Sequence, residues 1–247
     1  MPDLKKRRMM LSRTDAGYIR EGLKLYFDAE EPFMNVNIDG KTESIWNDRA
    51  VNGQKAVINN VIQSGNSTIW DGESSSGKML SQEYLPMSGI LSGCKERTIE
   101  VVCKINDTEN PQIIILGCGR ANVDDWAAGL WYRPASGGFK VGSASDQRPA
   151  LVRNVADRAS YSVVFGDSGL DDYSFYQNMQ LCTHGSVGGN MNNYTFVTVG
   201  SRYYNNNFSY RFNGEINCIR VYDRKLTDSE REHNFMIDKR RFGIDAG

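Results

Sequence analysis

The sequence lacks any apolar run approaching the roughly 20 residues that a membrane-spanning helix needs. It also lacks a secretory signal, because no apolar stretch follows the basic start "MPDLKKRRMMLSRTDAG". The formal net charge is -1, so the field of the whole molecule gives no reason to expect nucleic acid or another polyanion as a partner. These absences argue against a helical membrane span and predict a protein that is made and kept in a cytoplasm.

Cysteine and histidine are scarce. The five cysteines are widely spaced and form no Cys-x-x-Cys pair, so neither a zinc site nor a disulfide framework is predicted. Of the two histidines, His233 falls in a predicted helix and His184 in a predicted loop, where a lone histidine is more often a solvated side chain than a catalytic base. No His-Glu-x-x-His motif, Gly-x-Ser-x-Gly elbow or phosphate-binding glycine loop occurs.

Alternating carboxylates, which glycan-cleaving enzymes on a sandwich fold place along one strand, are also missing. Their chemistry needs two carboxyl groups roughly 5 to 9 Å apart across the scissile bond. The nearest acidic cluster is "FDAEEPF", in which Glu30 and Glu31 are neighbours that a strand would send to opposite faces. The sequence therefore predicts that the protein is not an enzyme.

What the sequence does have is a series of short strand patterns. Leu23, Leu25 and Phe27 alternate with more polar residues, which is the period of a half-buried strand, and "RTIEVVCKIND" repeats the pattern. Turn signals separate these segments, and 24 glycines suit a fold with many tight turns. We predict one all-β domain over residues 17–247, an antiparallel two-sheet β-sandwich or jelly roll. Residues 1–16 are polar and basic, and are predicted to form an arm.

A single helix is predicted near the C-terminus, at about residues 228–241. Thr227 and Glu230 form the spacing of a capping box at its start, and Gly243 provides a stop at its end. Acidic residues crowd its first turns and basic residues its last, as the helix dipole favours. We expect this helix to close one edge or end of the sandwich.

Two segments carry the side chains that recognise sugars, namely aromatic faces for stacking and polar groups for hydroxyls. They are "NVDDWAAGLWYRP" and "GGNMNNYTFVTVGSRYYNNNFSYRFNG". The alternative is that Trp131 belongs to the core and that the asparagine runs only form turns. The candidate ligand-binding residues are Asp124, Asp125, Trp126, Asn193, Arg202, Tyr203, Tyr204 and Asn205.

No cofactor is predicted, and metal binding is left open. The pairs Asp124–Asp125 and Asp171–Asp172 supply hard oxygens suited to Ca²⁺, but neither has the spacing of a ligand loop, which favours solvated turns. The basic cluster Lys5–Arg8 is compatible with docking on an acidic partner, although a solvated terminus is the default interpretation.

Three stretches carry a family resemblance. "GLKLYFDAEE", "SIWNDRAVNGQKAVI" and "FNGEINCIRVYDRKLTDSEREHNFMIDKRRF" resemble the laminin-G-type domains of the concanavalin A-like superfamily found in bacteriophage and gut-bacterial proteins. The Phe-x-Gly-x-Ile…Arg-Val-Tyr-x-Arg-x-Leu-Thr close is the most specific part, and the Trp-x-Asp opening at Trp46 and Asp48 is weaker. The resemblance spans about residues 18 to 242. It implies a sandwich of two curved sheets that serves glycan binding, protein adhesion or, in some relatives, glycan cleavage, and the fold does not decide among them.

Together these observations predict a non-catalytic glycan-binding or adhesion domain. Because the chain carries no export signal, we expect a bacteriophage virion protein of the capsid, tail or fibre, assembled in the host cytoplasm and contacting host surface carbohydrate. Two alternatives stay open: a purely structural virion protein that binds other subunits, and a divergent glycan hydrolase or lyase. A homo-oligomer is compatible with either kind of binding protein, since adhesins gain affinity through multivalency.

Overall fold

The computed structural model describes residues 17–38, 40–50, 55–79, 96–118, 126–134, 138–141, 149–151, 155–167, 169–186, 196–204 and 207–244. The basic arm predicted over residues 1–16 lies outside this part of the chain, so the arm and the domain boundary at residue 17 stay predictions. Within the described part, no helix is long and apolar enough to cross a membrane.

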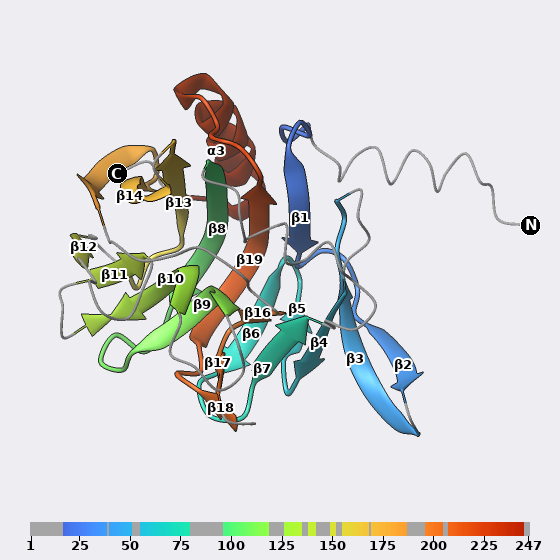
Figure 1. Cartoon of the computed structure of the whole chain (residues 1–247). Helices are drawn as coiled ribbons and strands as arrows, with labels where there is room; N and C mark the ends of the chain where they lie inside the picture. The colour runs from blue at the N-terminus through green and yellow to red at the C-terminus, as the bar shows by residue number, and fades with distance from the viewer. Residues whose placement is uncertain are drawn as a thin grey trace, which may run out of the picture.

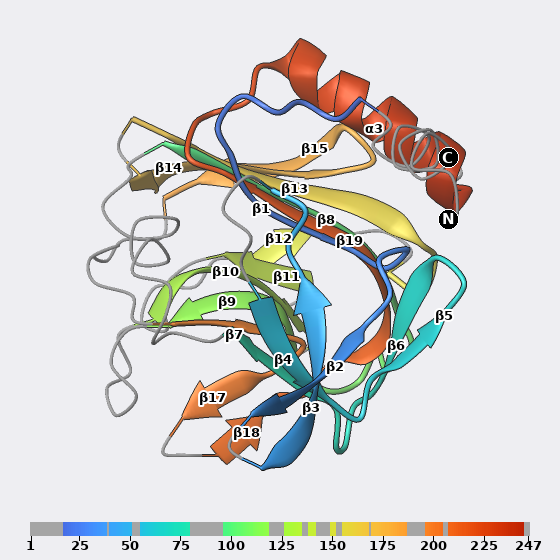
Figure 2. The same cartoon turned by 90° about the vertical axis from the view of Figure 1, so that its right-hand side faces the viewer.

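Two antiparallel sheets, one of eight strands and one of nine, lie face to face, and a small two-stranded sheet stands apart (Figure 1, Figure 2). This arrangement confirms the predicted all-β, two-sheet sandwich with a helix near its C-terminal end. In spatial order, the eight-stranded sheet contains β15 (Gln180–Gly185), β14 (Gly169–Gln177), β13 (Ala159–Gly166), β8 (Arg97–Ile105), β19 (Asn213–Tyr222), β6 (Ser67–Asp71) and β5 (Ile62–Ser64), with β1 (Leu23–Asp28) also paired to β19. The nine-stranded sheet contains β12 (Pro149–Leu151), β11 (Gly138–Val141), β10 (Trp126–Arg133), β9 (Gln112–Cys118), β16 (Phe196–Val199), β7 (Ser76–Met79), β4 (Lys55–Asn59), β3 (Lys41–Asn47) and β2 (Met34–Ile38). The two-stranded sheet is β17 (Arg202–Tyr204) with β18 (Asn207–Ser209).

The main core lies between the two large sheets. Alternation along β1 sends Leu25 and Phe27 into this core, where the Phe27 ring stacks on Trp46 of the opposite sheet with ring centroids 5.0 Å apart. Tyr26 and Asp28 point to the other side of the sheet, yet both are fully buried. The prediction that β1 is a half-buried strand is therefore wrong, because a second layer covers its outer face.

That second layer is helix α3 (Asp228–Phe242), which packs across the outer face of the eight-stranded sheet (Figure 2). A second apolar cluster joins Phe235 and Ile237 of the helix to Tyr26, Val102 and Cys218 of three strands. The prediction placed the helix at an edge or end of the sandwich. The observed place differs because Tyr26, Val102 and Cys218 face outward and need apolar cover, and because the charged residues beside them pair with side chains of the helix.

The predicted helix caps are confirmed. The Thr227 hydroxyl accepts a hydrogen bond from the Glu230 amide at 3.3 Å, and the Glu230 carboxylate accepts one from the Thr227 amide at 2.9 Å. At the other end, Gly243 adopts a left-handed conformation with φ 64° and its amide donates to the Lys239 carbonyl at 3.1 Å.

Candidate functional site

The structure divides the predicted ligand-binding residues. Asp124, Asp125, Asn193 and Asn205 lie outside the described residues. Trp126 begins β10, where its backbone pairs with that of Cys118 on β9.

The other three predicted residues lie together. Arg202, Tyr203 and Tyr204 form β17, which pairs with β18 as a hairpin outside both large sheets. Figure 1 shows this hairpin at the lower end of the sandwich, opposite helix α3.

A contact between aromatic rings brings the two predicted segments together. Trp131 of β10 is 3% exposed, whereas Tyr210, just after β18, is 39% exposed. Their rings meet edge to face with centroids 6.3 Å apart. Because Leu130 and Tyr132 belong to the inter-sheet core, alternation along β10 places Trp131 on the outer face of the nine-stranded sheet. Trp131 is thus buried, but on the outer face of the nine-stranded sheet beside Tyr210 and not in the core between the sheets.

Three guanidinium groups lie over three aromatic rings at this end of the molecule. The Arg133 guanidinium lies 5.6 Å from the centroid of Trp131, that of Arg202 lies 5.7 Å from Tyr210, and that of Arg211 lies 5.6 Å from Phe208. All three arginines are half-buried, so part of each remains accessible to solvent. We call this set the aromatic–arginine cluster: Trp131, Arg133, Arg202, Phe208, Tyr210 and Arg211.

Backbone strain marks the centre of the cluster. Tyr210 has φ 49°, a left-handed conformation that is uncommon for a bulky side chain. Two backbone hydrogen bonds hold the chain at and after this residue: the Ile113 amide donates to the Tyr210 carbonyl at 3.0 Å, and the Phe212 amide donates to the Gly200 carbonyl at 2.8 Å. Strained conformations persist only where the surroundings over-determine them, and they concentrate at ligand sites.

Arg211 fixes the cluster to a neighbouring turn. Its Nη1 donates to the carbonyl oxygens of Ser74 and Ser75 at 2.9 and 3.0 Å. The sequence prediction missed Tyr210 and Arg211, although both lie in the second segment that was singled out. The available signal was the alternation of aromatic residues with Arg211 in "FSYRF"; the left-handed backbone at Tyr210 leaves no such trace.

The carboxylates of Asp71 and Asp107, in two loops near the cluster, already accept hydrogen bonds from donors in their own loops. Although burial acts against it, hydrogen bonds from Ser74 and Ser75 hold the pKa of Asp71 well below its usual range. The Asn110 side chain and the amide of Glu109 lower the pKa of Asp107 in the same way. Both carboxylates thus stay charged while accepting N–H and O–H groups, an arrangement unlike that of a Ca²⁺ site. Among the described residues, no group of three or more His, Cys, Asp or Glu side chains is placed to hold a metal ion.

Two predictions about turns are wrong. Asp171 and Asp172 lie within β14, and His184 lies within β15, where both segments were expected to be loops. The Nδ1 atom of His184 is 3.1 Å from the Ser174 hydroxyl and 3.9 Å from the Asp172 carboxylate. A Ser-His-Asp relay needs the two partners on different ring nitrogens, so these three residues do not form one.

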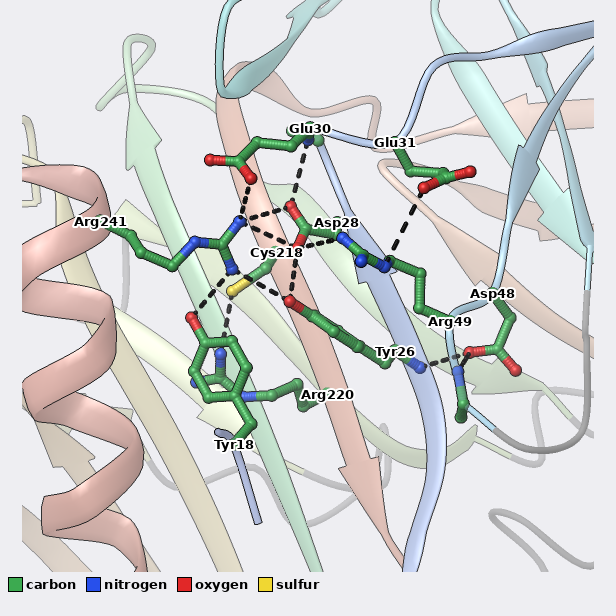
Figure 3. A network of polar contacts seen from close by, with 12 residues as sticks. Tyr18, Tyr26, Asp28, Glu30, Glu31, Asp48, Arg49, Cys218, Arg220 and Arg241 are labelled. Carbon is green, nitrogen blue, oxygen red and sulfur yellow. Dashed lines mark hydrogen bonds and ion pairs between the residues drawn. The ribbon is translucent and has the colours of Figure 1, made fainter. Parts of the chain in front are cut away.

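A second polar constellation lies beneath helix α3 (Figure 3). Arg220 of β19 pairs with Asp238 of the helix, and Arg241 pairs with Asp28 of β1 at 2.9 Å. The Tyr26 hydroxyl also donates to Asp28, and burial together with that carboxylate raises the pKa of Tyr26 well above its usual range. Tyr26, Asp28 and Asp238 are fully buried, which closes this constellation to ligands and makes it a fastening of the helix.

Trp46 and Asp48, which carried the opening part of the family resemblance, hold the backbone of β1. The Trp46 indole donates to the Asp28 carbonyl at 2.9 Å, and Asp48 accepts from the amides of Tyr26 and Ala50 at 2.6 and 2.8 Å. Their roles in this structure are therefore architectural.

Comparison with known proteins gives the fold and no family. No family model matches the chain, and no curated protein matches it. Among solved structures, Trypanosoma rangeli sialidase in complex with sialic acid matches with a TM-score of 0.65 at 14% identity, over 91% of this chain and 34% of that chain. A structure that relates cell entry of botulinum neurotoxin type C to interaction with two ganglioside molecules matches with a TM-score of 0.60 at 11% identity, over 92% of this chain and 52% of that chain. The chain spans about a third of the sialidases, so the likeness shows the fold alone.

These neighbours correct one expectation. Sialidases are enzymes, and their appearance among the similar structures contradicts the prediction that the protein is not an enzyme. Paired carboxylates are the catalytic groups of most glycosidases, whereas sialidases use a tyrosine nucleophile, so the missing pair does not exclude an enzyme of the sialidase kind. Missing carboxylate alternation is therefore no ground for excluding glycan cleavage.

Proposed function

We propose that the chain is a glycan-binding domain whose sugar-contacting surface is the aromatic–arginine cluster. The observation that carries the proposal is the strained and exposed Tyr210, with Arg202 over its ring and Trp131 at its edge. An exposed aromatic face stacks on the C–H patches of a sugar ring, and guanidinium N–H groups hydrogen-bond its oxygens. The neighbours that bind sialic acid or interact with gangliosides support this class of ligand.

The cluster is preorganised for such a role. Backbone hydrogen bonds at the Tyr210 carbonyl and the Phe212 amide hold the chain there, and the Arg211 side chain donates to the carbonyl oxygens of Ser74 and Ser75. A ligand that binds to fixed side chains does not have to order them, which preserves affinity in a small contact.

The test is a glycan array followed by titration calorimetry with the whole chain. Tyr210→Asn removes the ring but keeps a residue that tolerates φ 49°, and we expect it to weaken glycan binding about tenfold or more. Tyr210→Phe keeps the ring and is expected to retain binding. Met236→Asn is the matched control, because Met236 is 52% exposed on helix α3, away from the cluster.

An array without any bound glycan, or equal affinity of the Tyr210→Asn variant and the unchanged chain, would refute the proposal.

For the biological setting we propose a bacteriophage virion protein that contacts host surface carbohydrate. The laminin-G-type resemblance of the closing segment "FNGEINCIRVYDRKLT" supports this placement. Mass spectrometry of purified particles is the test, and absence of the chain from the particles would remove the virion from the proposal without affecting glycan binding.

A further inference from the structure

We infer that the aromatic–arginine cluster selects sugars that carry a carboxylate, and that Arg202 determines this selectivity. The inference rests on the proposed function, and it adds the chemical class of the ligand. Sialic acids and uronic acids both present the required group, a carboxylate on a sugar ring.

The density of guanidinium groups is the first ground. Arg133, Arg202 and Arg211 each lie within 6 Å of an aromatic ring of one cluster, at 5.6, 5.7 and 5.6 Å. A neutral sugar needs no such concentration of positive charge beside its stacking surface, because uncharged amides and hydroxyls serve its hydroxyl groups equally well.

The geometry of the guanidinium is the second ground. Arginine presents five N–H donors in a planar fork that matches the two oxygens of a carboxylate. A guanidinium that lies over a ring directs its N–H groups outward in its own plane, at the rim of the stack. Arg202 lies over the exposed Tyr210 ring, so a sugar stacked beside that ring comes within reach of its N–H groups.

The third ground for carboxylate selectivity is that Arg211 is held by uncharged hydrogen-bond partners. Its Nη1 donates to two carbonyl oxygens, of Ser74 and Ser75, which fix the side chain without neutralising its charge. A carboxylate brought by a ligand would gain from that fixed positive charge, since charge-assisted hydrogen bonds are about twice as strong as neutral ones.

Nearby carboxylates limit the distance over which the cluster attracts an anionic sugar. Asp71 and Asp107 lie in the adjoining loops and accept hydrogen bonds from those loops, so the end of the sandwich is not a broad basic field. Selectivity must then come from direct contact with the guanidinium fork and not from long-range attraction, and salt should weaken binding only moderately.

The experiment compares matched ligands by titration calorimetry with the full chain. One arm uses sialyllactose and lactose, and the other uses a glucuronate-terminated oligosaccharide and its carboxyl-reduced form, so the two arms separate the two sources of the carboxylate. We expect the acidic member of at least one pair to bind about tenfold more tightly than its neutral counterpart.

Variants assign the effect to Arg202. Arg202→Gln should lower affinity for the acidic ligand about tenfold and leave affinity for the neutral ligand unchanged, whereas Arg202→Lys, which keeps charge without the fork, should fall between. Arg240→Gln is the matched control, because Arg240 is an exposed arginine on helix α3. Thermal unfolding of each variant checks that the fold is kept, and Arg133→Gln provides a second substitution in the cluster if Arg202→Gln fails to fold.

The outcomes separate the two proposals. Equal affinity for acidic and neutral ligands, or equal loss of both in Arg202→Gln, overturns the carboxylate selectivity and leaves glycan binding standing. Absence of binding to every glycan overturns the proposed function and this inference with it.

Discussion

Arg220 and Asp238 form a bidentate ion pair in which neither side chain is exposed to solvent. Nη1 and Nη2 of Arg220 donate to the two carboxylate oxygens of Asp238 at 2.8 and 2.6 Å, and Nε donates to Glu100 at 2.9 Å. The Tyr18 hydroxyl adds a further hydrogen bond to Asp238 at 2.7 Å. The last helix is thus joined to the centre of the eight-stranded sheet by buried charge as well as by apolar contact.

Removing the charge of Asp238 should destabilise the protein strongly. Asp238→Asn leaves the buried Arg220 with one carboxylate where it had two, and breaking a buried ion pair in this way costs about 3 to 5 kcal/mol. Urea unfolding at neutral pH measures the change. The control is Asp223→Asn, because Asp223 pairs with Lys24 at a partly exposed site where ion pairs contribute about 1 kcal/mol or less. Similar losses in the two variants would contradict a special role for the buried pair.

Two glycines with nearly the same φ should respond differently to alanine. Gly200 has φ 65°, and a Cβ atom there would lie 2.3 Å from the ring of Trp70, so the Trp70 side chain would have to move. Gly65 has φ 60° and open space around the same position. Gly65→Ala should cost about 1 kcal/mol from strain alone, while Gly200→Ala adds overpacking of about 1 to 3 kcal/mol. Equal unfolding midpoints of the two variants would show that the Trp70 side chain moves aside without a measurable loss of stability.

The helix start should contribute stability that acid removes. Hydrogen bonds from Arg224 and then from Thr227, acting against partial burial, lower the pKa of Glu230 to about 2 from an ordinary 4.5. A carboxyl whose pKa is lowered in the folded state stabilises it above pH 4.5, and this contribution is lost as the pH falls toward 2. Glu230→Gln keeps the capping geometry but not the charge, so it should cost about 1 kcal/mol at pH 7 and progressively less in acid. Urea unfolding at several pH values tests this, and a cost that does not change with pH would contradict it.

Tyr210 should contribute little to stability although its ring is central to the proposed site. Asparagine tolerates the left-handed conformation better than tyrosine, so Tyr210→Asn relieves strain of about 1 kcal/mol while losing the contact with Trp131. We expect the free energy of unfolding to change by less than about 1 kcal/mol. A loss of several kcal/mol in thermal or urea unfolding would mean that the ring serves the fold instead.

Local patterns predicted the parts of the fold that depend on local chemistry. The alternation of apolar residues correctly predicted that β1 and β8 are strands. Thr227, Glu230 and Gly243 correctly predicted both ends of the helix, because capping is decided within a few residues. The place of the helix was not predicted. It depends on which sheet face needs cover, and that follows from the outward Tyr26, Val102 and Cys218 only once three distant strands are side by side.

The candidate site was predicted only in part for the same reason. Arg202 was identified because arginine and aromatic residues are concentrated in its segment. Tyr210 was not, because its importance comes from a left-handed backbone and from the ring of Trp131, which is 79 positions away in the chain. Contacts across that separation leave no periodic signal in one sequence.

The order of the strands bears on how the protein is synthesised. β19 pairs with β8 along one side and with β6 and β1 along the other, yet it is the last strand of this sheet in chain order. Until residue 222 has emerged, β8 and β13 on one side and β1 and β6 on the other have no strand between them, and their facing edges stay open to pairing with other chains. Translation that stops before Asn213 should therefore yield aggregates and not a smaller folded domain, however many of the earlier strands are already complete.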